Sequence, residues 1–190
     1  EVQFDNDSLR EAVKEWLKNE SDAIQKYGHI SNWNVSQVTN MSYMFYDAKT
    51  FNHDISKWDV SQVTTMENMF NTAADFNQDI SGWDVSSVTD MHNMFANAKA
   101  FNQAIGQWNV SQVTTMDGMF WNATAFNQDI GKWPIRRDCN INTMFHKSGM
   151  SAETFTGIYG NKIAKYFGLE NPDEDAVWEP YTRRERRINA

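Results

Sequence analysis

Residues able to do acid–base, nucleophilic or metal chemistry are few in this chain of 190 residues. The one cysteine, Cys139, excludes a disulfide framework and a cysteine-based zinc site. The histidines form no pair at the short spacings typical of metal ligands, and a Ser-His-Asp triad can be drawn only by ignoring geometry. They are His29, His53, His92 and His146. The sequence therefore predicts neither an enzyme nor a bound cofactor or metal.

Oxygen ligands that recur along the chain raise the question of calcium. An aspartate follows an asparagine by two positions at Asn52 and Asp54, Asn77 and Asp79, and Asn127 and Asp129. Hard oxygen ligands suit Ca²⁺, but Ala104 breaks the series and the sequence has no Asp-x-Asp-x-Asp-Gly loop. The alternative, which the sequence favours, is that the asparagines bind backbone groups in turns.

A row of polar residues is the first candidate binding surface. They alternate with Trp and Val along the chain, so we expect them to face outward. These residues, which we call the polar stripe, are Asn34, Asp59, Asp84 and Asn109, with Ser36, Ser61, Ser86 and Ser111 beside them. Such a stripe could hold an extended peptide or a glycan through side-chain hydrogen bonds. The alternative is a solvated face, or side chains that satisfy backbone groups in turns.

Three aromatic residues depart from the pattern of the chain. Tyr46 and Trp121 occupy a position that is filled elsewhere by Asn71 and Ala96, and Tyr43 stands where other units have Asn or Gly. Isolated exposed aromatic residues are common, but Tyr and Trp are also favoured contact residues. The sequence therefore predicts a possible interface at these three positions.

The elements that position these residues come from a repeat. The phrase Trp-Asp-Val-Ser-Ser-Val-Thr-Asp-Met-His-Asn-Met-Phe and its variants recur every 25 residues, at Trp33, Trp58, Trp83, Trp108 and, altered, Trp133. A fixed period of this length is typical of a solenoid, in which each unit buries its apolar face against its neighbours. We predict an α/β repeat solenoid of five coils over residues 33–147.

Each unit is predicted to contain a short strand and a short helix. Trp58 and Val60 are two apart, as on one side of a β-strand. Apolar residues at spacings of three, three and one follow and predict a helical turn: Val63, Met66, Met69 and Phe70. Thr64 and Glu67 would open that turn as a capping box. The strands would stack into a parallel sheet, with columns of Trp, Phe, Met and Val as the core.

The two ends of the solenoid need covering. Residues 1–32 are predicted to form an N-terminal helical cap, and residues 148–168 a C-terminal cap. In the first cap, Ser8 and Glu11 form a capping box that begins a helix. Its apolar face would consist of Leu9, Ala12, Val13, Trp16 and Leu17.

Residues 169–190 are predicted to form an extended tail. Its aromatic and basic residues are Trp178, Tyr181, Arg183, Arg184, Arg186 and Arg187. Aromatic anchors and arginines that pair with acidic groups are typical of interfaces. The tail therefore supports docking onto a partner in a larger assembly, with packing on its own acidic repeats as the competing interpretation.

The net charge and hydropathy of the chain limit the classes of partner that we expect. The net charge is −8, and residues 33–132 carry ten acidic residues against four lysines. An acidic repeat body repels a phosphate backbone, so nucleic acid is not expected as a partner. No apolar run approaches the ~20 residues that span a bilayer, and the first residues are not a signal peptide. We therefore expect no transmembrane segment and no targeting signal within this chain.

The repeat resembles a known family. The phrase W-[DN]-V-S-x-V-T-x-M-x-x-M-F, followed by A-x-x-F-N-Q-x-I, resembles the bacterial surface protein repeat of 25 or 26 residues, a domain of unknown function. The order of apolar positions is also similar to that of BspA-type leucine-rich repeats. The resemblance covers residues 8 to about 146. It implies a leucine-rich-repeat-like solenoid on secreted or surface-displayed, adhesin-like proteins, and no enzyme activity.

The sequence thus predicts a non-catalytic recognition or scaffold module at the cell surface or outside the cell. Its partner would be a protein, peptide or glycan, bound on the polar stripe. The alternative is a structural subunit of a larger assembly, docked through the aromatic and arginine-rich tail.

Overall fold

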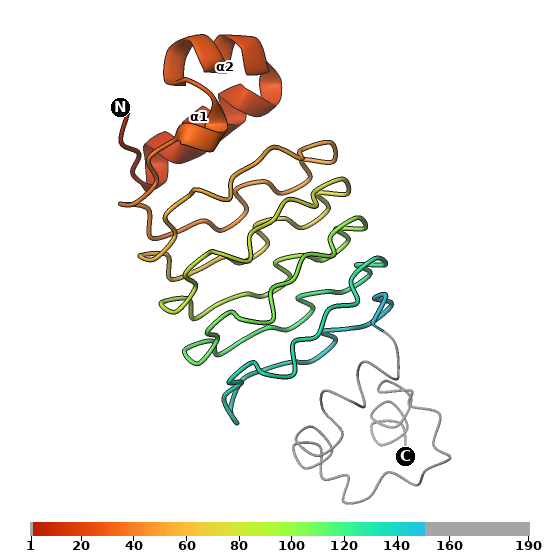
Figure 1. The fold of residues 1–190 in the computed structure, drawn as a ribbon. Helices are drawn as coiled ribbons and strands as arrows, with labels where there is room; N and C mark the ends of the chain where they lie inside the picture. Colours follow the sequence, from red (N-terminus) through yellow and green to blue (C-terminus); the bar gives the residue numbers. More distant parts are fainter. Residues whose placement is uncertain (1, 151–190) are drawn as a thin grey trace, which may run out of the picture.

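The computed structural model describes residues 2–150. Within this range the helices are α1 (Asn6–Lys18), α2 (Glu20–Tyr27) and the short 3-10 helix η1 (Ile30–Asn32). The remaining described chain winds as successive coils stacked along one axis, and α1 and α2 lie across one end of the stack (Figure 1).

Helix α1 begins three residues earlier than predicted. Its N-cap is Asp5, whose carboxylate accepts a hydrogen bond from the backbone N–H of Ser8 at 2.8 Å. The N–H of Asp5 donates in return to Ser8 Oγ at 2.9 Å, so the predicted capping box of Ser8 and Glu11 is wrong. The predicted apolar face is buried except for Leu17, which is 44% exposed.

Two polar side chains of α1 complete the open edge of the first coil. The side-chain oxygen of Asn6 accepts hydrogen bonds from the N–H groups of Thr39 and Asn40, at 2.9 and 3.0 Å. The guanidinium of Arg10 donates to the carbonyl of Ser42 at 2.7 Å. Helix α1 therefore covers the apolar end of the stack and also satisfies backbone groups that no preceding coil can reach.

Neighbouring coils are joined by a ladder of backbone hydrogen bonds. We call the surface formed by residues 40–48, 65–73, 90–98, 115–123 and 140–148 the ladder face. Between the second and third coils, four alternate N–H groups donate to carbonyls at 2.8–2.9 Å: Met66 to Asp90, Asn68 to His92, Phe70 to Met94 and Thr72 to Ala96. The intervening N–H groups bond within their own coil: those of Met69 and Asn71 donate to the carbonyl three residues earlier, and that of Glu67 donates to the hydroxyl of Thr65 at 3.4 Å.

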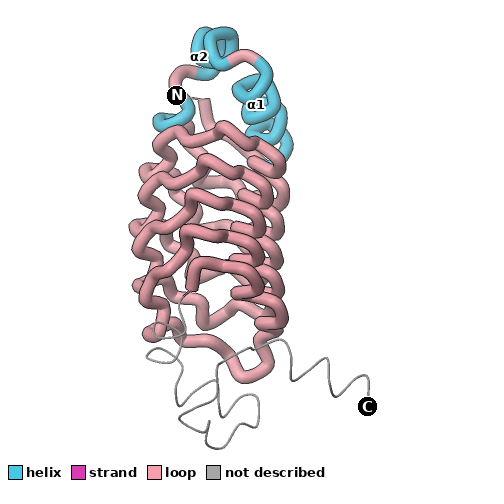
Figure 2. The backbone as a smooth tube through the Cα atoms, turned by 90° about the vertical axis from the view of Figure 1, so that its right-hand side faces the viewer, coloured by secondary structure: helices cyan, strands magenta, loops and turns pink. Residues whose placement is uncertain are grey.

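This geometry overturns the predicted fold class. Between residues 33 and 150 the structure contains no helix and no strand beyond isolated parallel bridges. The bridges run in one row through Asn40, Thr65, Asp90, Thr115 and Asn140. The leucine-rich-repeat-like coil of β-strand plus helix is therefore wrong. Figure 2 shows the helices confined to the N-terminal end, with turns and loops in every coil below them.

The predicted strand and helix of each unit are replaced by turns. The segment of Trp58 and Val60 pairs with no neighbouring strand and leads into a turn, in which the N–H of Val63 donates to the Val60 carbonyl at 2.9 Å. The hydroxyl of Thr64, predicted as a helix cap, donates instead to the carbonyl of Thr39 in the preceding coil at 3.2 Å. The apolar residues still point inward at the predicted spacing, because consecutive turns on the ladder face place them there without forming a helix.

Each ladder segment holds two residues in the left-handed backbone region. In the second coil these are Asn68, with φ 54°, and Thr72, with φ 64°. Asn, Asp or Gly, which tolerate this conformation best, fill most of the equivalent positions in the other coils. A β-branched residue such as Thr72 is strained there because its side chain crowds the following carbonyl.

Replacing Thr72 by asparagine should therefore raise the free energy of unfolding, by about 1 kcal/mol. Asparagine already occupies the equivalent positions of the next two coils, where Asn122 donates a side-chain hydrogen bond to Asn97 at 2.8 Å. Urea denaturation checks the prediction, with Thr50→Asn as a control because Thr50 is exposed and does not adopt positive φ. A lower urea midpoint for Thr72→Asn would contradict it.

The interior consists of columns of like side chains, one from each coil. Phe45, Phe70, Phe95 and Phe120 stack at ring-centroid distances of 5.5–5.7 Å. A second column runs beside it through Phe51, Phe76, Phe101 and Phe126, at 6.0–6.1 Å. The predicted core of Phe, Trp, Met and Val columns is confirmed by the burial of these residues.

The tryptophans form a third column. Trp58, Trp83, Trp108 and Trp133 are each at most 5% exposed. Their indole N–H groups donate to isoleucine carbonyls of the preceding coil at 2.9–3.2 Å: Ile30, Ile55, Ile80 and Ile105. Because each indole ring is buried and its N–H is hydrogen-bonded within the stack, the tryptophan column stabilises the fold and is not available to a ligand.

In the fifth coil the buried residue before the ladder is displaced by one position, while the ladder itself keeps its register. In the fourth coil the buried residue before the ladder is Val113, and a spacing of 25 would place Asp138 at the same position of the fifth. The buried residue is instead Cys139. Burial raises the pKa of its thiol to about 11, so the thiol stays protonated near neutral pH.

The predictions for residues 151–190 lie outside the described residues. They are the C-terminal cap over 148–168, apart from its first three residues, and the tail over 169–190. The interface residues predicted there are Trp178, Tyr181, Arg183, Arg184, Arg186 and Arg187.

Candidate functional site

The polar stripe lies at the surface, where its side chains form hydrogen bonds within turns. The carboxylate of Asp84 accepts a hydrogen bond from the N–H of Ser86 at 3.0 Å, and Asp59 accepts from the N–H and hydroxyl of Ser61 at 3.1 and 2.7 Å. Asn34 with Ser36 and Asn109 with Ser111 repeat the arrangement. Side-chain and backbone hydrogen bonds from Ser86 also hold the pKa of Asp84 below its ordinary value. The stripe therefore performs a turn-stabilising role, which was the alternative interpretation of these residues.

The asparagines that suggested calcium bind backbone in the next coil. The side-chain oxygen of Asn77 accepts from the N–H of Asn102 and from the amide of Gln103, both at 2.9 Å. Asn52 and Asn102 make the same pair of bonds to the coils that follow them. The nearby aspartates accept a backbone N–H two residues on, as Asp79 does from Ser81 at 2.9 Å. These oxygens are already used to hold turns together.

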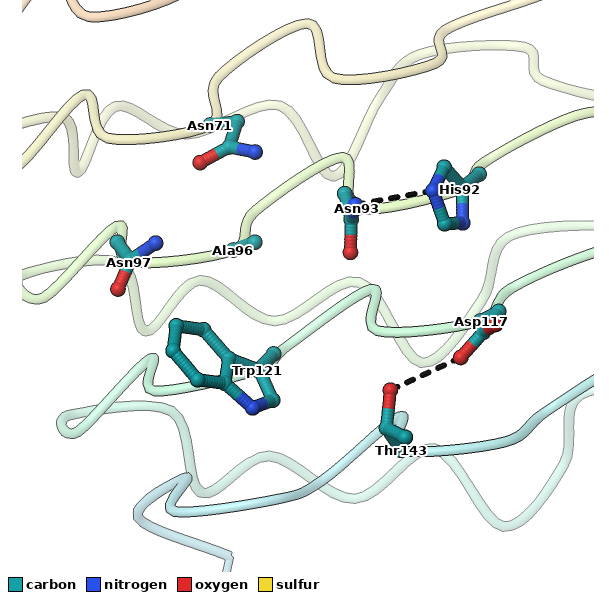
Figure 3. A pocket seen from close by; sticks show the side chains of 8 residues that line it. All are labelled: Asn71, His92, Asn93, Ala96, Asn97, Asp117, Trp121 and Thr143. Carbon is teal, nitrogen blue, oxygen red and sulfur yellow. Dashed lines mark hydrogen bonds between the residues drawn. The ribbon is translucent and has the colours of Figure 1, made fainter.

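The ladder face carries a hollow beside Trp121. Its volume is about 380 Å³, and we call it the Trp121 hollow. It is lined by Asn71, His92, Asn93, Ala96, Asn97, Asp117, Trp121 and Thr143. Figure 3 shows the Trp121 ring along one side, with polar side chains from neighbouring coils around it.

A small residue, Ala96, leaves the space for the hollow. Ala96 stands in the row between Asn71 of the preceding coil and Trp121 of the next, so a larger side chain is missing from the middle of the row. Because adjacent coils joined by such ladders are about 4.8 Å apart, the backbones that carry Asn71 and Trp121 are about 10 Å apart. In the adjoining row Gly118 makes room for the Asn93 side chain, whose oxygen would lie 2.1 Å from a Cβ at that position.

The polar groups around the hollow are held by short hydrogen bonds. The hydroxyl of Thr143 donates to the carboxylate of Asp117 at 2.9 Å, and the amide of Asn93 lies 3.0 Å from His92 Nε2 (Figure 3). The amide of Asn71 donates to the side-chain oxygen of Asn68 at 2.7 Å. These amide, hydroxyl and carboxylate groups can each make further hydrogen bonds beyond the ones named.

One side of the Trp121 ring is in contact with a neighbouring aromatic ring. Its ring packs on the imidazole of His146, one coil further on, with centroids 6.1 Å apart and planes inclined by 22°. The opposite neighbour in the row is Ala96, whose methyl group cannot cover an indole. The tryptophan is therefore partly exposed toward the hollow and can offer a ring face to a ligand.

Tyr43 and Tyr46 lie on the same face in the first coil. They are 48% and 51% exposed, and their ring centroids are 5.5 Å apart. The hydroxyl of Tyr43 donates to Glu67 at 3.1 Å, and this bond raises the pKa of the Tyr43 hydroxyl. The structure thus places all three aromatic residues predicted as an interface on the ladder face, with Trp121 three coils from the tyrosines.

Sequence reasoning missed the polar walls of the hollow. Asn93, Asn97 and Asp117 sit at ordinary repeat positions, so nothing in their residue types singled them out. The usable signal was the loss of side-chain bulk at Ala96, next to the gain of bulk at Trp121.

No helix in the part of the chain that the structure describes has both the length and the apolar content needed to cross a membrane.

Comparison with known proteins places the chain in a family. Residues 11–105 and 54–157 match, as two overlapping segments, the family described as Mycoplasma protein of unknown function, DUF285. No curated protein and no solved structure matches the chain. The two segments together cover well over half of the 190 residues. The chain therefore belongs to the DUF285 family of repeat proteins of unknown function.

Proposed function

We propose that this protein is a non-catalytic recognition module that binds an oligosaccharide in the Trp121 hollow. The observation that carries the proposal is the partly exposed face of Trp121 beside the gap left by Ala96, with amide and carboxylate groups around it. An aromatic face packs well against the C–H side of a sugar ring, while planar amides and carboxylates bind its hydroxyl groups. Both parts of that requirement meet in this hollow.

The backbone of the ladder face argues for a glycan over a peptide. Extended peptides commonly bind by adding a strand to free N–H and C=O groups. On this face the N–H groups of each coil are used between coils or within turns, as those of Asn93 and Met94 are. A ligand must therefore be recognised through side chains, which suits a sugar.

The shape of the face suits a chain of sugar units. Tyr43 and Tyr46 lie three coils from Trp121, a distance of about 14 Å at the usual spacing between paired chains. Aromatic residues spaced along one face can each support one part of an extended oligosaccharide. The tyrosines thus extend the proposed surface beyond the hollow.

The hollow lacks the groups that glycoside hydrolysis requires. That reaction ordinarily uses two carboxyl groups on opposite sides of the scissile bond. Asp117 is the only carboxylate among the described residues that line the hollow, and Thr143 already donates to it. We therefore propose binding without cleavage.

The proposed setting is the cell surface or the extracellular space, as in the bacterial surface protein repeats that the sequence resembles. The structural-subunit alternative depends on residues 169–190, which lie outside the described residues. Fractionation of cells that express the natural protein, followed by protease treatment of intact cells, tests the surface location. Protection of the protein in intact cells would contradict surface display.

Replacing Trp121 by alanine should weaken oligosaccharide binding about tenfold or more, which corresponds to ~1.4 kcal/mol. The wild-type domain is first screened on an array of microbial, plant and animal oligosaccharides, and the best-bound sugar is then titrated calorimetrically. Ala96→Phe should weaken binding similarly because the new ring fills the hollow.

The matched control is the double substitution Asp59→Ala and Asp84→Ala in the polar stripe. It should leave the affinity unchanged, since these side chains serve their own turns. Binding that is lost in this variant and kept in Trp121→Ala would move the site to the stripe. An array on which no sugar binds would refute the proposal.

A further inference from the structure

Three groups able to bind a metal meet where the helical cap joins the first coil. They are Glu20 at the start of α2, His29 just after α2 and His53 in the first coil. One ligand atom from each lies within 4.8 Å of those of the other two. His53 Nε2 and a carboxylate oxygen of Glu20 are already 3.5 Å apart. The three residues are far apart in the sequence, so the sequence does not reveal the cluster. They meet because α2 folds back over the first coil.

Both imidazole rings are held by Trp16, a buried residue of α1. The ring of His29 meets the indole edge-on, with centroids 5.3 Å apart and planes at 86°. The ring of His53 does the same at 5.1 Å and 87°, and the two imidazoles are 6.0 Å apart. Contact with one rigid aromatic side chain keeps the two imidazoles close to each other before an ion binds.

His53 is a departure from the repeat. The corresponding residues of the next three coils are Gln78, Gln103 and Gln128. Each of these amides donates to the asparagine of the preceding coil, at 2.9–3.0 Å. The first coil has a helical cap before it in place of another coil, and there the glutamine is replaced by a histidine that faces His29 and Glu20.

His29 has a partner for its second nitrogen. Its Nδ1 lies 2.8 Å from the hydroxyl of Ser31. Histidine ligands ordinarily donate their other N–H to an oxygen, which fixes the ring and its tautomer. In this conformation Nδ1 also accepts the backbone N–H of Ser31 at 3.3 Å, so metal binding through Nε2 requires the His29 ring to turn until Nδ1–H can donate to Ser31 Oγ.

We propose that Glu20, His29 and His53 form a site for a divalent transition metal, with Zn²⁺ as the best-suited ion. Two imidazoles and one carboxylate, with water as fourth ligand, are a common zinc donor set, with bonds of about 2.0–2.2 Å. Tetrahedral ligands at such distances lie roughly 3.3 Å apart, so the pair of His53 and Glu20 is nearly in place and His29 must approach by rotation of its side chain. The ion would join α2, the loop after it and the first coil, and so fasten the cap to the repeats.

Isothermal titration of the full-length, tag-free and EDTA-treated protein with ZnCl₂ at pH 7.5 tests the site. We expect one ion per chain and a higher thermal midpoint with zinc. His53→Gln installs the residue that the later coils carry, so the variant should keep the fold. It should weaken zinc binding by about tenfold or more. Glu20→Gln should weaken binding as well, whereas Glu11→Gln, on an exposed part of α1, should not.

Nitrogen-15 spectra of the imidazoles identify the ligands directly. Zinc should shift the ring nitrogens of His29 and His53 and leave those of His92 unchanged. The proposal is overturned if the wild-type protein binds no zinc, or if His53→Gln binds it as tightly as the wild type. A titration in which zinc shifts other imidazoles would likewise overturn it.

Discussion

Replacing Phe95 by alanine is expected to lower the free energy of unfolding by about 3–5 kcal/mol. Phe95 lies in the middle of its column, 5.6 Å from the ring of Phe70 and 5.7 Å from that of Phe120. It also stacks on Phe101 of its own coil at 3.9 Å, and its side chain is fully buried. Alanine leaves a cavity that the hydrogen-bonded coils on either side cannot close, so burial and ring contacts are both lost.

Chemical denaturation followed by far-ultraviolet circular dichroism measures this loss. Tyr46→Ala is the matched control, because it removes an aromatic ring of similar size that is 51% exposed, and its effect should stay within ~0.5 kcal/mol. Equal losses for Phe95→Ala and Tyr46→Ala would contradict the role of the phenylalanine column.

Replacing Gly106 by alanine is expected to cost about 2–3 kcal/mol. A Cβ at this position would lie 2.2 Å from the backbone carbonyl oxygen of Asp129 in the next coil, and a backbone atom cannot rotate away. At this turn Ala104 stands where neighbouring coils have an aspartate, and the N–H of Ile105 donates to the carbonyl of Gln103 at 2.9 Å.

Gly82→Ala supplies the comparison for Gly106→Ala. A Cβ on Gly82 would meet nothing within 4 Å, and Gly82 does not adopt positive φ, so its replacement should be neutral or slightly stabilising. Thermal and urea unfolding of the two variants should separate them clearly. If Gly106→Ala unfolds at the wild-type midpoint, the coils are not packed as closely as this structure shows.

The core was predictable because it depends on residue type and period alone. A tryptophan every 25 residues, followed two positions later by valine, must occupy the same place in every coil, and burial confirms it for Trp58 and Val60. The predicted strand and helix were wrong because inward spacing does not determine hydrogen bonding. Met66, Met69 and Phe70 point inward at helical spacing, yet the N–H groups of Met66 and Phe70 donate to the next coil.

The candidate site was predictable only in part. Trp121 stood out because it replaces a smaller residue, but the hollow depends on Ala96 in the preceding coil, at a distance that coil stacking sets. Ligand binding by the polar stripe stays a prediction, and its residue types do not reveal that Asp84 is hydrogen-bonded within its own turn. A residue pattern alone shows neither where a small side chain leaves a hollow nor which polar side chains are already hydrogen-bonded.

The ladder face also has an electrical direction. In an ordinary β-strand successive amides point to opposite neighbours, so their dipoles largely cancel. Here alternate amides turn back within their own coil, and the four N–H groups of a ladder segment that reach the next coil all point toward the C-terminal coils. In the third coil they outnumber the two flanking N–H groups that point the other way, those of Thr89 and Ala100. Partial negative charge therefore gathers at the opposite end, where the guanidinium of Arg10 meets the carbonyl of Ser42. Helix α1 thus supplies a positive charge at the negative end of an aligned array of peptide dipoles. Inserting a further coil would lengthen the array but would not create another charged end.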